Sequence, residues 1–147
     1  GDQLDLVELN PRFVELLQAQ FREQPTFMRV ASQSAVHQCP LQEFKNDAPY
    51  DYVISGLPLN NFPPQLVREI FDAYFRLLAP AGVLSYFEYM YVRSLKKSLS
   101  PKKEERQRLS ALDEIIQPHL NSHRVRRDWV FANIPPAWVQ HLRVNSQ

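Results

Sequence analysis

The sequence predicts an α/β fold built on a doubly wound, largely parallel sheet. Along residues 4–90, short apolar segments typical of buried strands alternate with longer segments whose apolar residues recur at helical spacing. The chain then closes with two strand-like segments, residues 124–133 and 137–144, joined by a short proline-containing turn at residues 134–136. Strands joined so closely pair antiparallel, so we expect a reversed hairpin at one edge of the sheet.

The first predicted strand covers residues 4–9 and carries Glu8 near its end. Asn10 and Pro11 follow, a pair typical of a helix start, because asparagine caps the first turn and proline lacks only an N–H that this turn leaves unpaired. Apolar residues then recur at helical spacing, so we predict a helix to about Glu23. They are Phe13, Leu16, Leu17 and Phe21.

Pro25 is expected to end this helix. The next elements predicted are a second strand over residues 27–31 and a loop or short helical turn over residues 40–46. A third strand, residues 51–55, runs into a tight loop. A helix over residues 64–78 follows that loop, because its apolar residues repeat at helical spacing.

The fourth strand is predicted from Val83 to about Met90, after a turn at residues 80–82. A last helix begins near Pro101, and Pro118 is expected to stop it before the closing hairpin. The element order is therefore strand and helix in repetition, followed by two antiparallel strands, which defines the doubly wound sheet.

Composition sets the limits on function. The 147 residues are 44% hydrophobic and 22% charged, typical of one soluble globular domain. A net charge of +1 gives no bulk electrostatic argument for nucleic acid or membrane binding. Cys39, the single cysteine, excludes an internal disulfide and is compatible with a reducing compartment. No apolar run approaches the roughly 18 to 20 residues needed to span a bilayer.

Three segments, residues 7–11, 50–58 and 78–84, resemble successive motifs of class I methyltransferases that use S-adenosylmethionine. Residues 130–137 resemble the final hairpin of bacterial phospholipid N-methyltransferases, and Ser-Gly-Leu-Pro-Leu at residues 55–59 is closest to the same group. The resemblance covers nearly the whole chain. It implies a Rossmann-like sheet, S-adenosylmethionine as cofactor, and transfer of methyl groups to the amine of phosphatidylethanolamine and its partly methylated forms.

Two departures from the resemblance matter. Related rRNA adenine dimethyltransferases carry Asn-Leu-Pro-Tyr where this chain has Gly-Leu-Pro-Leu at residues 56–59, so a stacking platform for adenine is missing and nucleic acid is not expected as a partner. The glycine-rich first motif, its strand and the helix before it are also absent. Because that strand would lie in the middle of the sheet, we expect the chain to be a fragment with two incompletely paired strands beside the missing one.

The resemblance implies a cofactor site at the carboxyl ends of the first strands. Its predicted residues are Glu8, Leu9, Gln38, Cys39 and Ser55, with Glu8 accepting hydrogen bonds from both ribose hydroxyls. The alternative for Glu8 is a surface carboxylate at the first turn of a helix. At Gln38 and Cys39 the acidic residue that the family often has near the adenine is missing, which weakens that part of the assignment.

The acceptor site is predicted at Ser55, Gly56 and Leu57, with Tyr89 as a further catalytic residue. Methyl transfer mainly needs positioning and desolvation, and backbone carbonyls with a serine hydroxyl can orient an amine hydrogen. The alternative is a purely structural turn. Four aromatic residues near this strand end either line a head-group pocket or form core: Tyr86, Phe87, Tyr89 and Tyr91.

A basic run over residues 93–108 follows directly. We predict substrate and membrane contacts at Tyr91, Arg93, Lys96 and Lys97, and the alternative is a solvated helix face. Trp129 and Trp138 are interface anchors or, as we expect, buried packing residues.

The resulting prediction is a peripheral enzyme on the cytoplasmic face of the membrane, with a phospholipid head group and an anionic surface as partners and no metal. The alternatives are a non-catalytic binding module of the same fold, or an N-methyltransferase acting on RNA or a small molecule.

Overall fold

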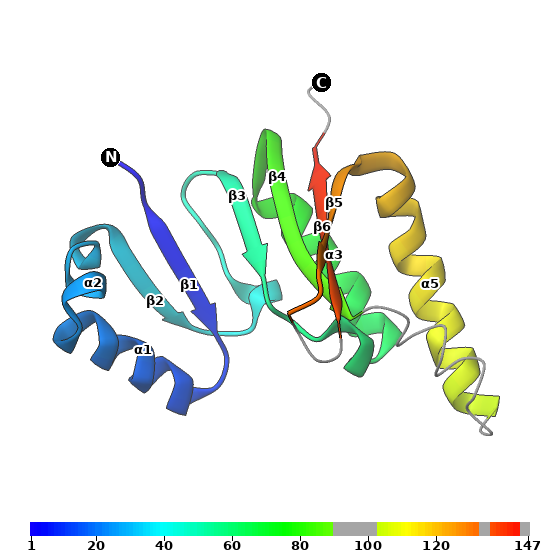
Figure 1. Ribbon diagram of the computed structural model, residues 1–147, viewed down its shortest axis with the longest axis horizontal. Helices are drawn as coiled ribbons and strands as arrows, with labels where there is room; N and C mark the ends of the chain where they lie inside the picture. The colour runs from blue at the N-terminus through cyan, green and yellow to red at the C-terminus, as the bar shows by residue number, and fades with distance from the viewer. Residues whose placement is uncertain (90–102, 133–135, 145–147) are drawn as a thin grey trace. The chain divides into compact units, whose positions relative to one another are not determined.

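The computed structural model describes residues 1–89, 103–132 and 136–144. These residues form two compact units, Gly1–Asn46 and Asp47–Gln147, and each is described by itself (Figure 1). The prediction that residues 1–147 make up a single methyltransferase domain stays a prediction. None of the described helices is both long and apolar enough to cross a bilayer.

The first unit is a parallel strand pair with helices in its connection. Strand β1 (Leu4–Glu8) pairs with β2 (Ser34–Gln38). Between them lie α1 (Pro11–Glu23) and α2 (Pro25–Met28). The side chain of Asn10 accepts a hydrogen bond from the backbone N–H of Arg12 at 3.0 Å, which confirms the predicted cap and helix start.

The prediction of a strand over residues 27–31 is wrong. Pro25 occupies the first turn of α2, where its missing N–H costs nothing, so it starts a new helical turn after ending α1. Phe27 then packs edge-on against Phe21 of α1, with ring centroids 5.3 Å apart. A short 3₁₀ turn, η1 (Ala31–Gln33), leads into β2, which is the actual second strand. The helical turn expected within residues 40–46 is η2 (Leu41–Glu43).

The second unit contains a four-stranded sheet in the order β3-β4-β6-β5. Strand β3 (Tyr50–Ser55) runs parallel to β4 (Leu78–Tyr89). Strands β5 (Arg124–Val130) and β6 (Ala137–Arg143) pair antiparallel, and β6 is also antiparallel to β4. The reversed C-terminal hairpin is therefore confirmed, and β3, β4 and β5 all end at the same edge of the sheet.

Two helices, α3 (Pro64–Leu77) and α5 (Lys103–His123), supply most of the core of this unit. The ring of Phe71 on α3 lies 5.7 Å from that of Tyr86 on β4 and 4.8 Å from that of His119 on α5. Helix α3 therefore contacts both the sheet and α5, and α5 itself packs against β5 and β6. Side chains that are at most 2% exposed include Val67, Ile70, Phe71, Tyr74, Leu84, Leu109, Leu112, Ile116 and Leu142.

The start of β4 and the end of α5 differ from the sequence prediction. Strand β4 begins at Leu78 rather than Val83, with an irregularity in its pairing to β3. At Gly82 a Cβ atom would lie 2.8 Å from the carbonyl oxygen of Ala79, so no larger residue fits there. Pro118 lies inside α5 and does not stop it. Burial of Leu120, which is 4% exposed, favours continuation of the helix over the local preference of proline.

Both sheets end in a strand that is paired on one side. Among the described residues, β1 pairs only with β2 and β3 pairs only with β4. On β3 the apolar side chains of Tyr52 and Ile54 are 72% and 85% exposed. The strand that the resemblance places in the middle of the sheet stays a prediction.

Candidate active site

The carboxyl end of β1 holds an acidic side chain in a fixed position. Glu8 stands opposite Gln38 of β2, so the two side chains leave the sheet at the same level. The backbone N–H of Asn10 donates a hydrogen bond to Oε1 of Glu8 at 2.7 Å. Among the described residues, Oε2 has no such partner. This carboxylate suits the two hydroxyls of a ribose, because Oε1 is held by Asn10 and Oε2 remains able to accept hydrogen bonds.

The other predicted cofactor residues of this unit lie at the same sheet edge. Leu9 is 63% exposed and Gln38 is exposed, whereas Cys39 is half-buried. Burial, and then the charge of Glu43, raise the pKa of the Cys39 thiol, which favours its neutral form. The structure brings Glu8, Leu9, Gln38 and Cys39 together, while their role in binding a cofactor stays a prediction.

The loop after β3 is tied to α3 through Ser55. The Ser55 hydroxyl lies 2.5 Å from the Tyr74 hydroxyl and also accepts a hydrogen bond from the backbone N–H of Leu57 at 3.2 Å. Burial raises the pKa of Tyr74 to about 12, despite the opposing effect of the Ser55 hydrogen bond, so its phenol is neutral. With these two partners the Ser55 hydroxyl keeps one further hydrogen-bonding position, and its predicted catalytic and cofactor-binding roles stay predictions. The backbone of Leu57 is also engaged within the loop, because its carbonyl oxygen accepts a hydrogen bond from the N–H of Leu59 at 2.9 Å. The predicted role of residues 55–57 in holding an acceptor stays a prediction.

One aromatic ring lies beside this loop. A Cβ atom on Gly56 would stand 3.8 Å from the ring of Phe87 on β4, whereas Tyr86 is 2% exposed and belongs to the core. Tyr86 is therefore a core residue, while a head-group pocket lined by Phe87 stays a prediction. Tyr89 pairs through its backbone with Ala137, but its side chain, like the whole of Tyr91, lies outside the described structure.

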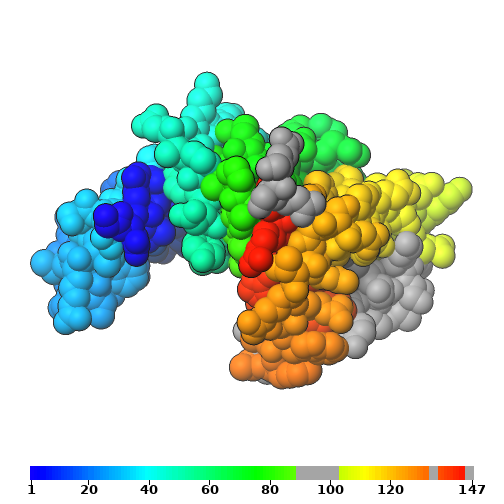
Figure 2. Space-filling model, turned by 90° about the horizontal axis from the view of Figure 1, so that it is seen from above, coloured from blue at the N-terminus to red at the C-terminus, as the bar shows by residue number. Residues whose placement is uncertain are grey.

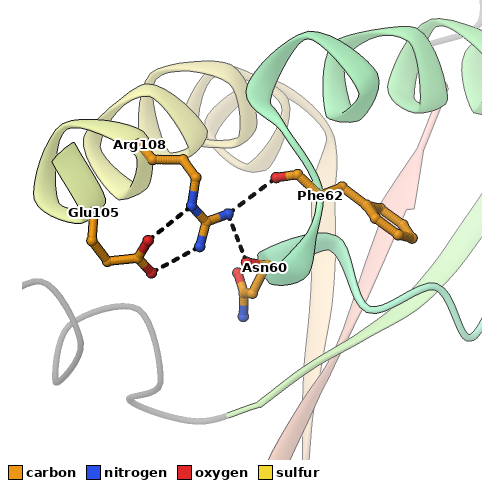
Figure 3. Close-up of polar contacts among 4 residues, drawn as sticks. All are labelled: Asn60, Phe62, Glu105 and Arg108. Carbon is orange, nitrogen blue, oxygen red and sulfur yellow. Dashed lines mark hydrogen bonds and ion pairs between the residues drawn. The ribbon is translucent and has the colours of Figure 1, made fainter.

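Arg108 of α5 fixes the next part of the loop, a role that was not predicted (Figure 3). Its Nη1 donates to the backbone carbonyl oxygens of Asn60 at 3.0 Å and Phe62 at 3.1 Å. Its Nε and Nη2 donate to the two carboxylate oxygens of Glu105, at 3.2 and 2.9 Å. The i, i+3 spacing of Glu105 and Arg108 was visible in the sequence, but the carbonyl partners come from the distant 3₁₀ turn η3 (Leu59–Asn61) and the residue after it.

The basic run is therefore not uniform. Arg108 is engaged by the loop, while Lys103 and Arg106 are exposed. Arg93, Lys96 and Lys97 fall outside the described residues, and their predicted contacts with substrate and membrane stay predictions. Within the described ranges, no three His, Cys, Asp or Glu side chains gather as a metal ion would require.

Comparison with known proteins gives one sequence match and many structural ones. No family model matches the chain. Over 85 residues the chain is 31% identical to an ornithine lipid N-methyltransferase of Singulisphaera acidiphila. The match covers 58% of this chain and 44% of the relative, so it spans less than half the length of that protein.

Solved structures show the fold. The chain is similar to the N-methyltransferase NodS of Bradyrhizobium japonicum WM9, with a TM-score of 0.64 and 15% identity over 98% of this chain and 74% of that one. NodS has also been solved with S-adenosyl-L-homocysteine. An O-methyltransferase of Bacillus cereus in complex with the same molecule gives a TM-score of 0.65 at 10% identity, covering 96% of this chain and 62% of that one. The chain therefore has the α/β fold of class I methyltransferases, as predicted.

Proposed function

We propose that the protein transfers methyl groups from S-adenosylmethionine to the amine of phosphatidylethanolamine and of its partly methylated forms. It would act as a peripheral enzyme on the cytoplasmic face of the membrane. The observation that carries the proposal is the anchored carboxylate of Glu8 at the carboxyl end of β1, in a chain with the methyltransferase fold. The similarity to an ornithine lipid N-methyltransferase supports a lipid amine as the acceptor.

Glu8 and its neighbours would hold the cofactor. Oε2 of Glu8 accepts hydrogen bonds from the ribose, while the hydrogen bond from Asn10 to Oε1 stops the carboxylate from rotating away. Gln38 and the backbone of Cys39 stand beside Glu8 and would meet the adenine. When bound, S-adenosylmethionine supplies a methyl carbon on a positively charged sulfur.

The loop after β3 would orient the acceptor. A neutral amine attacks the methyl carbon in line, the carbon–sulfur bond breaks as the carbon–nitrogen bond forms, and the ammonium proton passes to water. Backbone carbonyls of residues 55–57 accept the amine hydrogens without adding a full negative charge that would keep the amine protonated. The ring of Phe87 beside Gly56 adds an aromatic face, which favours a methylated ammonium group.

Ornithine lipid is the second candidate acceptor. The name of the sequence relative favours it, and it shares with phosphatidylethanolamine an amine carried on a membrane lipid. The same loop chemistry serves both, because the loop contacts the amine and not the rest of the head group.

Mass spectrometry of lipids tests the proposal. The full-length protein is incubated with methyl-deuterated S-adenosylmethionine and vesicles that contain phosphatidylethanolamine, or phosphatidylcholine with ornithine lipid. We expect deuterated methyl groups on phosphatidylethanolamine and few on a vesicle without a lipid amine. Label on ornithine lipid alone would make the second candidate the substrate. Label on neither lipid would contradict the proposal.

A further inference from the structure

The end of β5 carries an exposed aromatic cluster that the candidate active site does not use. Trp129 is 50% exposed and Phe131 is 69% exposed, and their rings stack with centroids 5.8 Å apart. Trp138 of β6 meets Trp129 edge-on at 5.9 Å. The expectation that the tryptophans are buried is therefore wrong for Trp129. Large apolar side chains gathered at one exposed place mark an interaction surface more often than scattered ones do.

An arginine completes this cluster. The guanidinium carbon of Arg127 lies 5.4 Å from the ring centroid of Trp129 and 4.9 Å from that of Trp138. Within the described part of the chain, Arg127 forms no ion pair, whereas Arg126 pairs with Asp128 at 2.7 Å. A guanidinium stacked on aromatic rings keeps its in-plane N–H groups available for a phosphate. We call Arg127, Trp129, Phe131 and Trp138 the β5 patch.

The β5 patch lies at the same edge of the sheet as the loop after β3, residues 55–62, which we call the acceptor loop. Val130 of β5 and Tyr89 of β4 both stand opposite Ala137 of β6, so these three residues form one row across the sheet. Ser55 ends β3 opposite Tyr86, three residues before that row. Figure 1 shows β3, β4 and β5 ending at this edge, and Figure 2 shows β5, in orange, at the surface of the second unit.

The arginines near the β5 patch indicate a negatively charged partner. Residues 124–143 contain four arginines and one acidic residue. Arg127 belongs to the β5 patch and Arg126 is paired with Asp128, whereas Arg124 and Arg143 lie near the opposite end of the hairpin. Arg124, Arg126 and Arg127 follow β5 itself, the outer strand of the sheet. Tryptophan and phenylalanine beside arginine match the boundary between the phosphates and acyl chains of an anionic bilayer.

We propose that the β5 patch docks the protein on an anionic lipid bilayer. Trp129 and Phe131 enter the head-group boundary, and Arg127 pairs with lipid phosphate. Since the patch and the acceptor loop share one sheet edge, docking would present lipid head groups to the loop, and this last step rests on the proposed function.

Vesicle flotation and tryptophan emission test the docking. The full-length protein is mixed with vesicles of phosphatidylcholine and phosphatidylglycerol, some with brominated acyl chains, and with pure phosphatidylcholine vesicles. We expect the protein to bind the anionic vesicles. Brominated acyl chains should quench its tryptophan emission, and this quenching should be weaker in the variant Trp129→Phe. The double variant Arg127→Gln/Phe131→Ser should bind about tenfold less. The control Phe13→Ser removes a ring that is 52% exposed in the first unit and should bind like the wild type.

The other outcomes of these experiments distinguish failure of the docking from failure of the proposed function. Equal loss of binding in the control and the double variant, or no quenching, would overturn the assignment of the patch. Binding of a single-stranded RNA oligonucleotide that depends on Arg127 and Phe131, without vesicle binding, would replace the bilayer by RNA. Vesicle binding without lipid methylation would overturn the proposed function and leave the docking intact. Methylation of vesicle lipid that the double variant leaves unchanged would overturn the docking alone.

Discussion

At the carboxyl end of β1, Glu8 is held by a hydrogen bond to a residue two positions away, whereas the loop after β3 is held by side chains from far along the chain. Tyr74, 19 residues from Ser55, fixes the start of that loop. Arg108, 48 residues from Asn60, fixes its middle. The first arrangement is local and the second depends on the packing of two helices.

Substitutions in the two regions should therefore differ in whether they change ligand binding or stability. A change at Glu8 removes a group at the sheet edge and leaves the core intact, so under the proposed function we expect it to affect ligand binding and not stability. A change at Arg108 or Tyr74 loosens the acceptor loop and also the contact of α3 or α5 with it. We therefore expect stability and activity to fall together at the loop and to separate at Glu8.

The largest effect on stability is expected from Arg108→Ala. This change removes donors from two backbone carbonyls and from Glu105, in a side chain that is only 27% exposed. We expect the free energy of unfolding to fall by about 2 to 3 kcal/mol, measured by urea denaturation. The control Arg106→Ala removes an exposed arginine of the same helix and should change it by less than about 0.5 kcal/mol. Equal losses in the two variants would show that the loop contacts do not matter.

The next effect concerns the hydroxyl pair. Ser55→Ala leaves the buried Tyr74 hydroxyl without its partner, so we expect a loss of about 1 to 3 kcal/mol. Tyr74→Phe leaves Ser55 with the Leu57 N–H and should cost about 1 kcal/mol. The double variant should cost less than the two single changes added together, because both remove one interaction. Strict additivity in a double-mutant cycle would contradict the pairing.

A smaller effect depends on pH and concerns the contact of α3 with α5. His119 stacks on Phe71 and Phe75 with centroids 4.8 and 4.9 Å away. Burial, and then the charges of His123 and Arg68, lower the pKa of His119 against the opposing effect of Asp72. The folded state therefore favours the neutral ring. This contribution is complete above the unfolded pKa, about 6.5, and is lost as pH falls from there through the lowered folded pKa.

His119→Phe keeps a ring on Phe71 and Phe75 but cannot take up a proton. We expect the melting temperature of the wild type to fall below about pH 6.5 more steeply than that of this variant. His123 remains in both proteins, so the difference between the two curves reports His119. Parallel curves from neutral pH to pH 5 would contradict the assignment.

Much of the fold followed from local signals. The Asn10 cap, the apolar face of α3 and the short connection before β6 each depend on neighbouring residues, and each was predicted from them. The predictions failed where packing between distant elements overrides local preference. Phe27 was placed in a strand but packs on Phe21, and Pro118 was placed at a helix end but lies inside α5.

The candidate site shows the same limit. The position of Glu8 was predictable because a strand end and a helix cap fix it locally, while its role in binding a cofactor stays a prediction. Arg108 was counted with a basic run, since its carbonyl partners become visible only once α5 lies beside the loop. Trp129 was expected in the core but is 50% exposed. The exposure of a side chain on an edge strand depends on which elements pack against that strand, and the sequence alone does not show this.

Calorimetry with S-adenosyl-L-homocysteine and the full-length protein tests most directly the claim that the carboxyl end of β1 binds S-adenosylmethionine. Glu8→Ala should weaken binding by about 1 to 3 kcal/mol, with a melting temperature close to that of the wild type. Glu8→Gln keeps an acceptor for the Asn10 N–H, so its affinity should lie between those of Glu8→Ala and the wild type. The control Glu15→Ala, exposed on α1, should bind like the wild type. Equal affinity of Glu8→Ala and the wild type would contradict the claim.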